Sequence, residues 1–152
     1  MAYEGPGEPV LRVKKKDALA ELPRYESSGA AGMDLRAFID RDITIAPMGK
    51  AKIPTGIFIE VPEGYEAQVR PRSGLAARSG LTVLNAPGTI DSDYRGELEV
   101  ILINLGAGSF TVKNNDRIAQ MLISPVIRAA ICEADTLSET ERGTGGFGST
   151  GI

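Results

Sequence analysis

Short runs of alternating hydrophobic and polar residues occupy most of this chain, and turn residues separate one run from the next. Hydrophobic side chains that recur at every second residue are typical of β-strands with one buried face. Almost no segment shows the spacing of an amphipathic helix. The sequence therefore predicts an all-β domain, either a sandwich or a barrel. The runs cover residues 33–39, 43–45, 57–61, 65–69, 82–84, 98–104, 110–112 and 118–123.

One run departs from this alternation. Residues 100–103 read Val-Ile-Leu-Ile, so both faces of the expected strand are hydrophobic. Such a strand can lie in the middle of one sandwich core, or it can be covered by the core on one face and by a partner chain on the other. The sequence favours neither arrangement.

The composition agrees with many short strands in one domain. The 152 residues include 18 glycines and 9 prolines, and 42% are hydrophobic, which is sufficient for one core. We expect residues 1–9 to form a flexible N-terminal arm and residues 10–133 to form the β domain. Residues 134–142 are polar and acidic, so residues 134–152 are expected to be a linker and a flexible, glycine-rich C-terminal tail.

The charge distribution favours a small ligand over a polymer. The chain has 17 Lys and Arg against 20 Asp and Glu, a net charge of −3, and no long basic run. Binding to nucleic acid or to a membrane is therefore not expected. No segment is hydrophobic over a membrane-spanning length and no leader precedes the strands, so we expect a soluble, cytoplasmic protein.

Histidine and cysteine are scarce in this chain. There is no histidine, so carboxylates are the candidates for acid–base chemistry. Cys132 is the single cysteine, which excludes an intrachain disulfide and suits a reducing compartment. We expect this cysteine to be buried as a small apolar side chain.

The end of the chain, residues 142–151, places a cation, an aromatic ring and hydroxyl groups on a glycine-rich backbone. Glycines allow backbone N–H groups to turn toward anionic oxygens, Arg142 adds a forked donor, and Phe147 can stack on a base. This segment is interpreted as a clamp for a phosphorylated ligand that carries a ring. The alternative is an ordinary disordered terminus.

Residues 70–80 contain three arginines, two serines and two glycines. We expect a short helical turn that opens at Ser73 and Gly74 and ends at Gly80. Its free N–H groups, together with the Ser73 hydroxyl and Arg72, would bind an anion. The alternative is a capped surface turn whose arginines face solvent.

Residues 85–98 combine a Pro-Gly turn signal with acids at Asp91 and Asp93 and with the adjacent Tyr94. This pattern predicts a hairpin that carries carboxylates. Near a phosphate chain, such a carboxylate can accept a proton from an attacking water. The alternative is that the aspartates only cap their own turn.

Five segments in a fixed order together resemble the motifs of the trimeric dUTP pyrophosphatases, the dUTPase family. The similarity extends from about Val10 to the end of the chain, with no substitution at a position on which the family relies. The resemblance implies a single-domain, jelly-roll-like β-sandwich and a homotrimer. The matching segments are residues 31–37, 71–76, 88–97, 116–121 and 142–151.

The resemblance implies hydrolysis of dUTP to dUMP and pyrophosphate, which keeps uracil out of DNA and supplies dUMP for dTMP synthesis. Asp91 would be the general base that deprotonates a water attacking the α-phosphorus. The hairpin would read uracil through backbone groups, and Tyr94 would pack against deoxyribose and leave no room for a 2′-hydroxyl. The substrate-binding residues carried over from the family are Arg72, Ser73, Gly74, Asn85, Gly88, Thr89, Ile90, Tyr94, Glu97, Gln120, Arg142, Phe147, Gly148, Ser149 and Thr150.

The same resemblance implies a Mg²⁺ ion that bridges the three phosphates, with Asp34 touching it only through water. Asp34 has a structural alternative, as a strand-end acid tied to Arg36 or to a neighbouring turn. The resemblance also divides the site among subunits. The Asp91 hairpin would come from one chain, the Ser73 and Gln120 motifs from a second, and the tail from the third.

Two other functions would fit the same fold. A dCTP deaminase of the same superfamily would need a glutamate that activates water at the base, whereas this hairpin carries the pyrophosphatase pattern at Asp91. A binding or regulatory protein could retain the fold without hydrolysis. Against that alternative, the residues expected to act on dUTP are all present.

Overall fold

The computed structural model describes residues 8–148, which form eleven β-strands and one short helix. The all-β prediction is confirmed, and all the paired strands are antiparallel. The elements are β1 (Arg12–Lys15), β2 (Arg24–Tyr25), β3 (Met33–Arg36), β4 (Ile43–Ile45), β5 (Lys50–Glu60), β6 (Tyr65–Arg70), α1 (Ser73–Ser79), β7 (Leu81–Val83), β8 (Gly88–Ile90), β9 (Glu97–Asn104), β10 (Phe110–Val112) and β11 (Arg117–Pro125).

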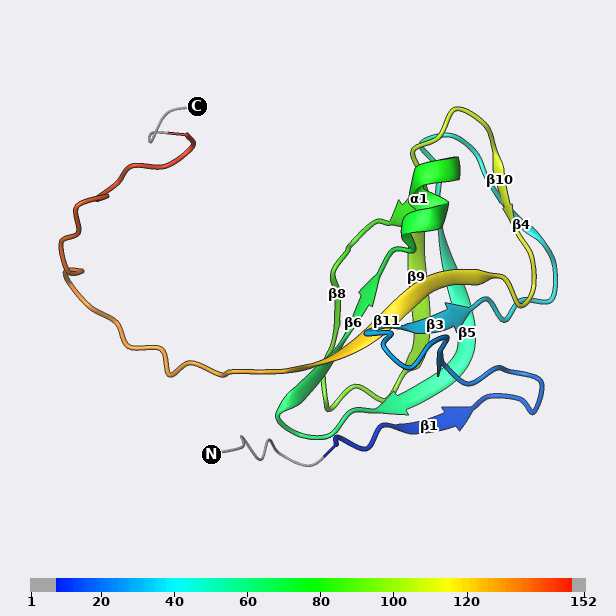
Figure 1. Cartoon of the computed structure of the whole chain (residues 1–152), viewed down its shortest axis with the longest axis horizontal. Helices are drawn as coiled ribbons and strands as arrows, with labels where there is room; N and C mark the ends of the chain where they lie inside the picture. The colour runs from blue at the N-terminus through cyan, green and yellow to red at the C-terminus, as the bar shows by residue number, and fades with distance from the viewer. Residues whose placement is uncertain (1–7, 149–152) are drawn as a thin grey trace.

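The strands form three sheets around one hydrophobic core (Figure 1). One sheet has the strand order β1-β5-β9-β7, and a second has the order β2-β3-β11-β6-β8. Strands β10 and β4 form a two-stranded ribbon at the right of Figure 1. Strands distant in sequence are neighbours in both large sheets, as expected for a jelly-roll-like sandwich.

Strand β9 contains the run that is hydrophobic on both faces. Val100 and Leu102 are buried in the core, whereas Ile101 and Ile103 on the opposite face are only half-buried. The strand therefore does not lie fully inside the core of one chain. Ile101 instead lines a surface cleft, which belongs to the candidate site.

The helical turn expected between Ser73 and Gly80 is present as α1. Gly80 ends it with a left-handed backbone, φ +68°, which favours glycine. The Gly80 carbonyl accepts a hydrogen bond from Leu105 N at 2.9 Å, so the end of α1 is tied to the loop after β9. A Cβ on Gly80 would lie 2.6 Å from the nitrogen of Gly106, so the two loops cross too closely for a side chain at this point.

The chain leaves the sandwich after β11. Val126 N still donates a hydrogen bond to Gly64 O at 2.8 Å, and the following described residues then run away from the body without forming a strand or helix (Figure 1). Cys132 lies in this segment and is exposed. The expectation that Cys132 is buried is therefore wrong, because the residue lies beyond the last strand that contributes to the core.

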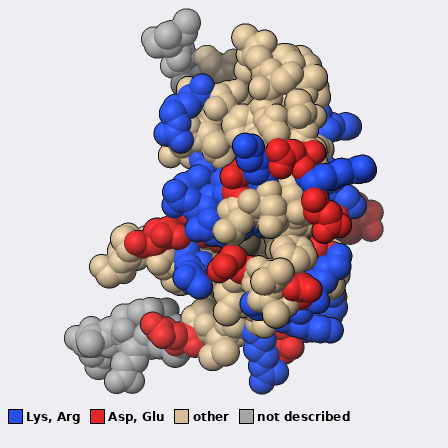
Figure 2. Space-filling view, turned by 90° about the vertical axis from the view of Figure 1, so that its right-hand side faces the viewer, with Lys and Arg blue, Asp and Glu red and all other residues tan. Residues whose placement is uncertain are grey.

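Charged side chains of both signs lie beside one another over the middle of the face shown in Figure 2. Oppositely charged pairs on the surface include Arg12 with Glu60 and Lys52 with Glu99. Among residues 8–148, no helix is long and apolar enough to cross a membrane.

Candidate active site

The five-stranded sheet brings three of the five motif segments together. Asp34 on β3 lies opposite Gln120 on β11, and Gln120 lies opposite Arg70 at the end of β6. From Arg70 the chain continues directly into α1. The residues expected to bind phosphate therefore share one end of this sheet, although they are far apart in sequence.

Asp34 lies between two arginines. Its Oδ1 is 3.3 Å from Arg72 Nε, its Oδ2 accepts a hydrogen bond from Arg117 Nη1 at 3.2 Å, and its side chain is 13% exposed. The expected alternative partner, Arg36, donates instead to Asn115 O at 2.9 Å. The sequence did not predict a role for Arg117, and its place in the matching segment 116–121 was the available signal.

The start of α1 has free backbone donors. Arg72 stands at the N-cap with an extended backbone, and its carbonyl accepts two N–H groups of the first turn, both at 3.1 Å. Within the described chain, the N–H groups of Ser73 and Gly74 have no hydrogen-bond acceptor. A Cβ on Gly74 would lie 3.2 Å from the guanidinium of Arg78, so a second cation stands beside these donors. The arrangement suits an anion.

Gln120 is fixed against the backbone beside this helix. Its Nε2 donates to Pro71 O at 3.0 Å. Its Oε1 lies only 2.5 Å from the position that a Cβ on Gly32 would take, so glycine at position 32 makes room for this amide. Gly32 is a further residue that the sequence did not predict to shape the site, although it belongs to the matching segment 31–37.

The expected hairpin is not a pair of neighbouring strands, because β8 lies in the five-stranded sheet and β9 lies in the four-stranded sheet. Residues 85–98, which we still call the Asp91 hairpin, cross from one sheet to the other through the turn after β8. Strand β8 pairs with β6, and the Ala86–Pro87 peptide bond before it is cis. Tyr94 N donates to Asp91 O at 3.2 Å, which closes the turn. The Tyr94 hydroxyl donates to Glu97 O at 3.1 Å, so the phenol is held over the start of β9.

A cleft of about 250 Å³ opens beside the Asp91 hairpin. The Asp91 side chain is exposed at its edge, and its carboxylate makes no hydrogen bond with another described residue. Lys52 and Glu99 form a hydrogen-bonded ion pair of 2.8 Å in the cleft, which raises the pKa of Lys52 above its usual value. The lining residues are Lys52, Thr89, Ile90, Asp91, Tyr94, Glu97, Leu98, Glu99 and Ile101.

Several predicted residues support the hairpin from within. Gly88 is buried in its pairing with Val69 on β6, and a Cβ on Gly88 would lie 3.1 Å from the side-chain amide of Asn85. The carboxylate of Glu97 is also occupied, because it accepts the N–H of Gly56 at 3.0 Å. A direct contact of these side chains with substrate stays a prediction.

Asp91 and Ser73 lie toward opposite ends of β6. Ile90, the residue before Asp91, pairs with Ala67, whereas Ser73 follows the other end of the strand. Six residues of extended chain span up to about 20 Å. In Figure 1, α1 lies at the top and the turn between β8 and β9 lies at the bottom. One chain therefore does not place both groups around one phosphate.

The tail does not join either group in this chain, because it runs away from the sandwich (Figure 1). Arg142 Nε donates to Gly145 O at 2.8 Å, the Phe147 ring is fully exposed, and the neighbouring Gly148 is exposed. Ser149 and Thr150 lie outside the described residues. The phosphate and base contacts expected of the tail therefore stay predictions.

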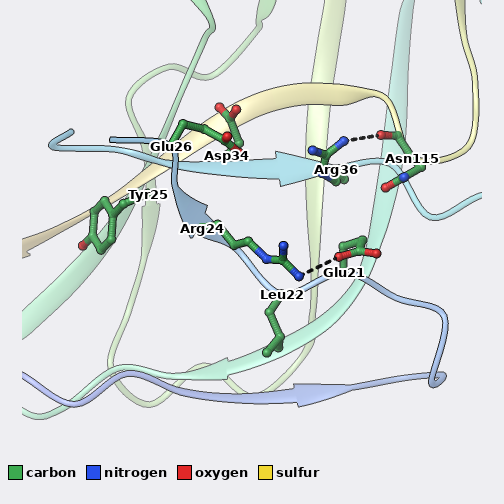
Figure 3. Close-up of a pocket in the computed structure, with 8 residues that line it drawn as sticks. All are labelled: Glu21, Leu22, Arg24, Tyr25, Glu26, Asp34, Arg36 and Asn115. Carbon is green, nitrogen blue, oxygen red and sulfur yellow. Dashed lines mark hydrogen bonds and ion pairs between the residues drawn. The ribbon is translucent and has the colours of Figure 1, made fainter. Parts of the chain in front are cut away.

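A second pocket, of about 320 Å³, lies beside β2 and β3 (Figure 3). Arg24 is 3.4 Å from Glu21 there, and Arg36 is directed toward Asn115. Among the predicted site residues, only Asp34 lines this pocket. Its lining residues are Glu21, Leu22, Arg24, Tyr25, Glu26, Asp34, Arg36 and Asn115.

Known proteins are similar to this chain over nearly its whole length. Residues 18–151 match the family model described as dUTPase. A deoxyuridine 5'-triphosphate nucleotidohydrolase from Rhizobium etli is 59% identical over 145 residues, which are 94% of this chain and 92% of that protein. A protein of the same name from Chlamydia pneumoniae is 58% identical over 136 residues, 89% of this chain and 94% of that one.

The fold is also similar to that of a solved dUTPase. A mutant of the Staphylococcus bacteriophage 80alpha dUTPase, solved with dUpNHpp, has a TM-score of 0.84 at 26% identity. The match covers 94% of this chain and 99% of that chain. The expected jelly-roll-like fold is confirmed, and the five motif segments lie within the matched family region. This chain belongs to the dUTPase family.

Proposed function

We propose that this chain hydrolyses dUTP to dUMP and pyrophosphate. The observation that carries the proposal is its 59% identity to the R. etli deoxyuridine 5'-triphosphate nucleotidohydrolase along 94% of the chain. The cleft beside the Asp91 hairpin suits the base and sugar of a nucleotide, and the free N–H groups at the start of α1 suit its phosphates. In the cell, the reaction would keep uracil out of DNA and supply dUMP for dTMP synthesis.

We propose Asp91 as the general base. Its exposed carboxylate makes no hydrogen bond within the described chain, so it is free to accept a proton from water. The water oxygen would bond to the α-phosphorus while the bond from that phosphorus to the bridging oxygen breaks. The proton would pass to Asp91, and pyrophosphate would leave with the bridging oxygen.

The phosphate chain would be bound at the end of the five-stranded sheet that carries α1. The N–H groups of Ser73 and Gly74, the guanidinium of Arg72 and the amide of Gln120 are the donors. Asp34 fixes Arg72 before substrate binds, so less conformational freedom is lost on binding. Positioning and charge neutralisation of this kind supply most of the catalysis in phosphoryl transfer.

A Mg²⁺ ion fits this site if the phosphates of the substrate supply most of its ligands, and not a cage of protein side chains. Residues 8–148 contain no group of three or more Asp, Glu, His or Cys side chains that could hold a metal. Both oxygens of Asp34 already contact arginines, so Asp34 would approach the ion only through water. Mg²⁺ commonly retains waters and binds substrate phosphates with one or two carboxylates. When bound, it would neutralise charge on the triphosphate.

The Asp34→Asn variant separates a role toward the arginines from a role toward the metal. The change removes the carboxylate shared by Arg72 and Arg117, so we expect the KM for dUTP to rise about 10-fold. The Mg²⁺ concentration that gives half the maximal rate should stay nearly unchanged. Pyrophosphate release is measured against dUTP and against MgCl₂, with Arg36→Gln as a control that leaves the Asp34 pairs intact. A large shift in Mg²⁺ dependence with an unchanged KM would contradict this assignment.

We propose that the complete site is shared among the subunits of a homotrimer. The separation of Asp91 from α1 supports this arrangement. The segment after β11 also exposes Ile127 and Ile131, which a neighbouring subunit would cover. We assign residues 10–133 to the β domain and residues 134–152 to a linker and a tail that closes on another subunit. The tail would place Phe147 over uracil, with Arg142, Gly148, Ser149 and Thr150 near the phosphates.

The Tyr94→Ala variant is expected to accept UTP more readily. The Tyr94 ring lines the cleft and its hydroxyl is fixed at Glu97 O, so the ring would occupy the space of a 2′-hydroxyl. We expect kcat/KM for UTP relative to dUTP to rise at least about 10-fold. Initial rates with both nucleotides measure this ratio. Tyr25→Ala is the control, because it removes an exposed tyrosine from the second pocket and should retain the wild-type ratio. An unchanged ratio in Tyr94→Ala would show that another residue determines sugar selectivity.

A comparison of dUTP, dCTP, dTTP and UTP in the presence of Mg²⁺ tests the proposed function. We expect rapid pyrophosphate release from dUTP and little from the other three. Ammonia released from dCTP would indicate a deaminase. Binding of dUTP without release of pyrophosphate would indicate a binding or regulatory protein.

A further inference from the structure

Strand β5 carries a bulge where it faces the start of β9. Pro54 lies opposite Glu99 and Phe58 lies opposite Glu97, so three residues of β5 face the single residue Leu98. Gly56, in the middle of the bulge, has a left-handed backbone with φ +68°. The buried Thr55 hydroxyl donates to Leu98 O at 2.6 Å. The bulge therefore fixes the backbone at the point where the Asp91 hairpin becomes β9.

Glu97 connects this bulge to Lys16, the residue that follows β1. Glu97 Oε1 accepts the N–H of Gly56 at 3.0 Å, and Oε2 lies 2.8 Å from Lys16 Nζ. The Lys16 backbone N–H in turn donates to Gly56 O at 2.8 Å. The Glu97 side chain is 18% exposed, so its charge depends on these partners more than a surface carboxylate would.

The backbone of the same glutamate holds Tyr94. Glu97 O accepts the phenol hydroxyl at 3.1 Å, and the ring lies so close to Gly96 that a Cβ at position 96 would clash with it. A shift of Glu97 would therefore move the hydrogen-bond acceptor that fixes the phenol. Lys16 reaches this point from 81 residues away and lines neither the cleft nor the end of the sheet that carries α1.

We propose that Lys16 is a positioning residue for Tyr94 and thereby a determinant of selectivity for deoxyribose over ribose. This inference rests on the proposed dUTP hydrolysis and adds a residue to the same site. Without the lysine, the Glu97 carboxylate retains only the Gly56 N–H as a donor and turns toward water. This movement displaces the backbone carbonyl of Glu97, and the Tyr94 ring moves away from the sugar with it. The hydrogen bond to Glu97 also raises the pKa of Lys16, so the lysine stays charged throughout the neutral range.

The Lys16→Met variant tests the inference, because methionine retains much of the stem and removes the charge and the donor. We expect the dUTP to UTP ratio of kcat/KM to fall about fivefold, mainly through a higher KM for dUTP and a lower KM for UTP. The kcat for dUTP should change little. Lys16→Arg, which keeps a charged donor, should restore most of the ratio. Arg12→Met is the matched control, since it breaks an exposed β1 ion pair with Glu60 and should leave the ratio unchanged.

A double-mutant cycle with Tyr94→Phe distinguishes positioning from a general loss of structure. Tyr94→Phe removes the other end of the same connection, so the two changes together should lower the ratio no more than the larger single change does. Additive effects, or a wild-type ratio in Lys16→Met, would overturn the inference. If Lys16→Met lost its thermal transition, Glu97→Gln would test the same connection, and an unchanged ratio there would also overturn it. A wild-type protein inactive on dUTP would instead refute the proposed function.

Discussion

The Asp91→Asn variant is expected to bind dUTP almost normally and to lose about two or more orders of magnitude in kcat. Asparagine has nearly the shape of aspartate but does not accept a proton from water, so the loss should fall on the chemical step. The Asp91 carboxylate makes no hydrogen bond within the described chain, so the change should not disturb the hairpin. Calorimetry with dUpNHpp measures binding, and single-turnover pyrophosphate release measures the chemical step.

The matched control for this prediction is Asp93→Asn. It removes the same charge from another exposed position in the same turn, and we expect it to lower kcat by less than about 10-fold. An equal loss in the two variants would point to the charge of the turn as a whole. An unchanged kcat in Asp91→Asn would exclude Asp91 as the base.

Deletion of residues 143–152 is expected to give a folded protein whose kcat/KM for dUTP is lowered roughly 10- to 100-fold. The described part of the tail lies away from the sandwich, and Phe147 is fully exposed, so the core should not depend on it. The substrate, in contrast, would lose the groups that cover its base and terminal phosphate. Circular dichroism during heating checks the fold, and initial rates check the activity. Loss of the native thermal transition would contradict the proposed role in closure.

Mixed assemblies of two variants can show which subunit the tail serves in the proposed homotrimer. Tail-deleted chains retain Asp91, and Asp91→Asn chains retain the tail. When the two are unfolded together and refolded, a complete site can form only if the base and the tail come from different chains. Activity above that of either parent variant would show that the tail of one chain completes the site of another. Mixed trimers without recovered activity would show that each tail closes on the Asp91 of its own chain.

The strands that the sequence predicted are those with a clear alternation. The expected residues 110–112 coincide with β10, and the expected run 98–104 differs from β9 by one residue. The sequence did not predict β1 or the first half of β5. Strand β1 contains mostly cations and is defined by its pairing with β5, while Pro54 and Gly56 are typical of a turn and instead form the bulge.

The parts of the candidate site that are local in sequence were also predictable. Glycine and serine at the ends of residues 73–80 indicated α1, and the Pro-Gly signal indicated a turn before β8, although β8 and β9 do not pair as a hairpin. The pairs of Asp34 with Arg117 and of Lys16 with Glu97 were not predictable, because they join residues 83 and 81 positions apart and depend on strand register. Register follows from the whole pattern of buried side chains and not from any one motif.

The position of Asp91 and Ser73 at opposite ends of one short strand has a consequence for dilute solutions. If isolated chains are inactive, activity per milligram would depend on how many chains are associated. When the protein concentration is below the dissociation constant of the trimer, activity per milligram would vary with the square of that concentration. The total activity on dUTP in a cell would then increase more than in proportion to the expression level of the gene.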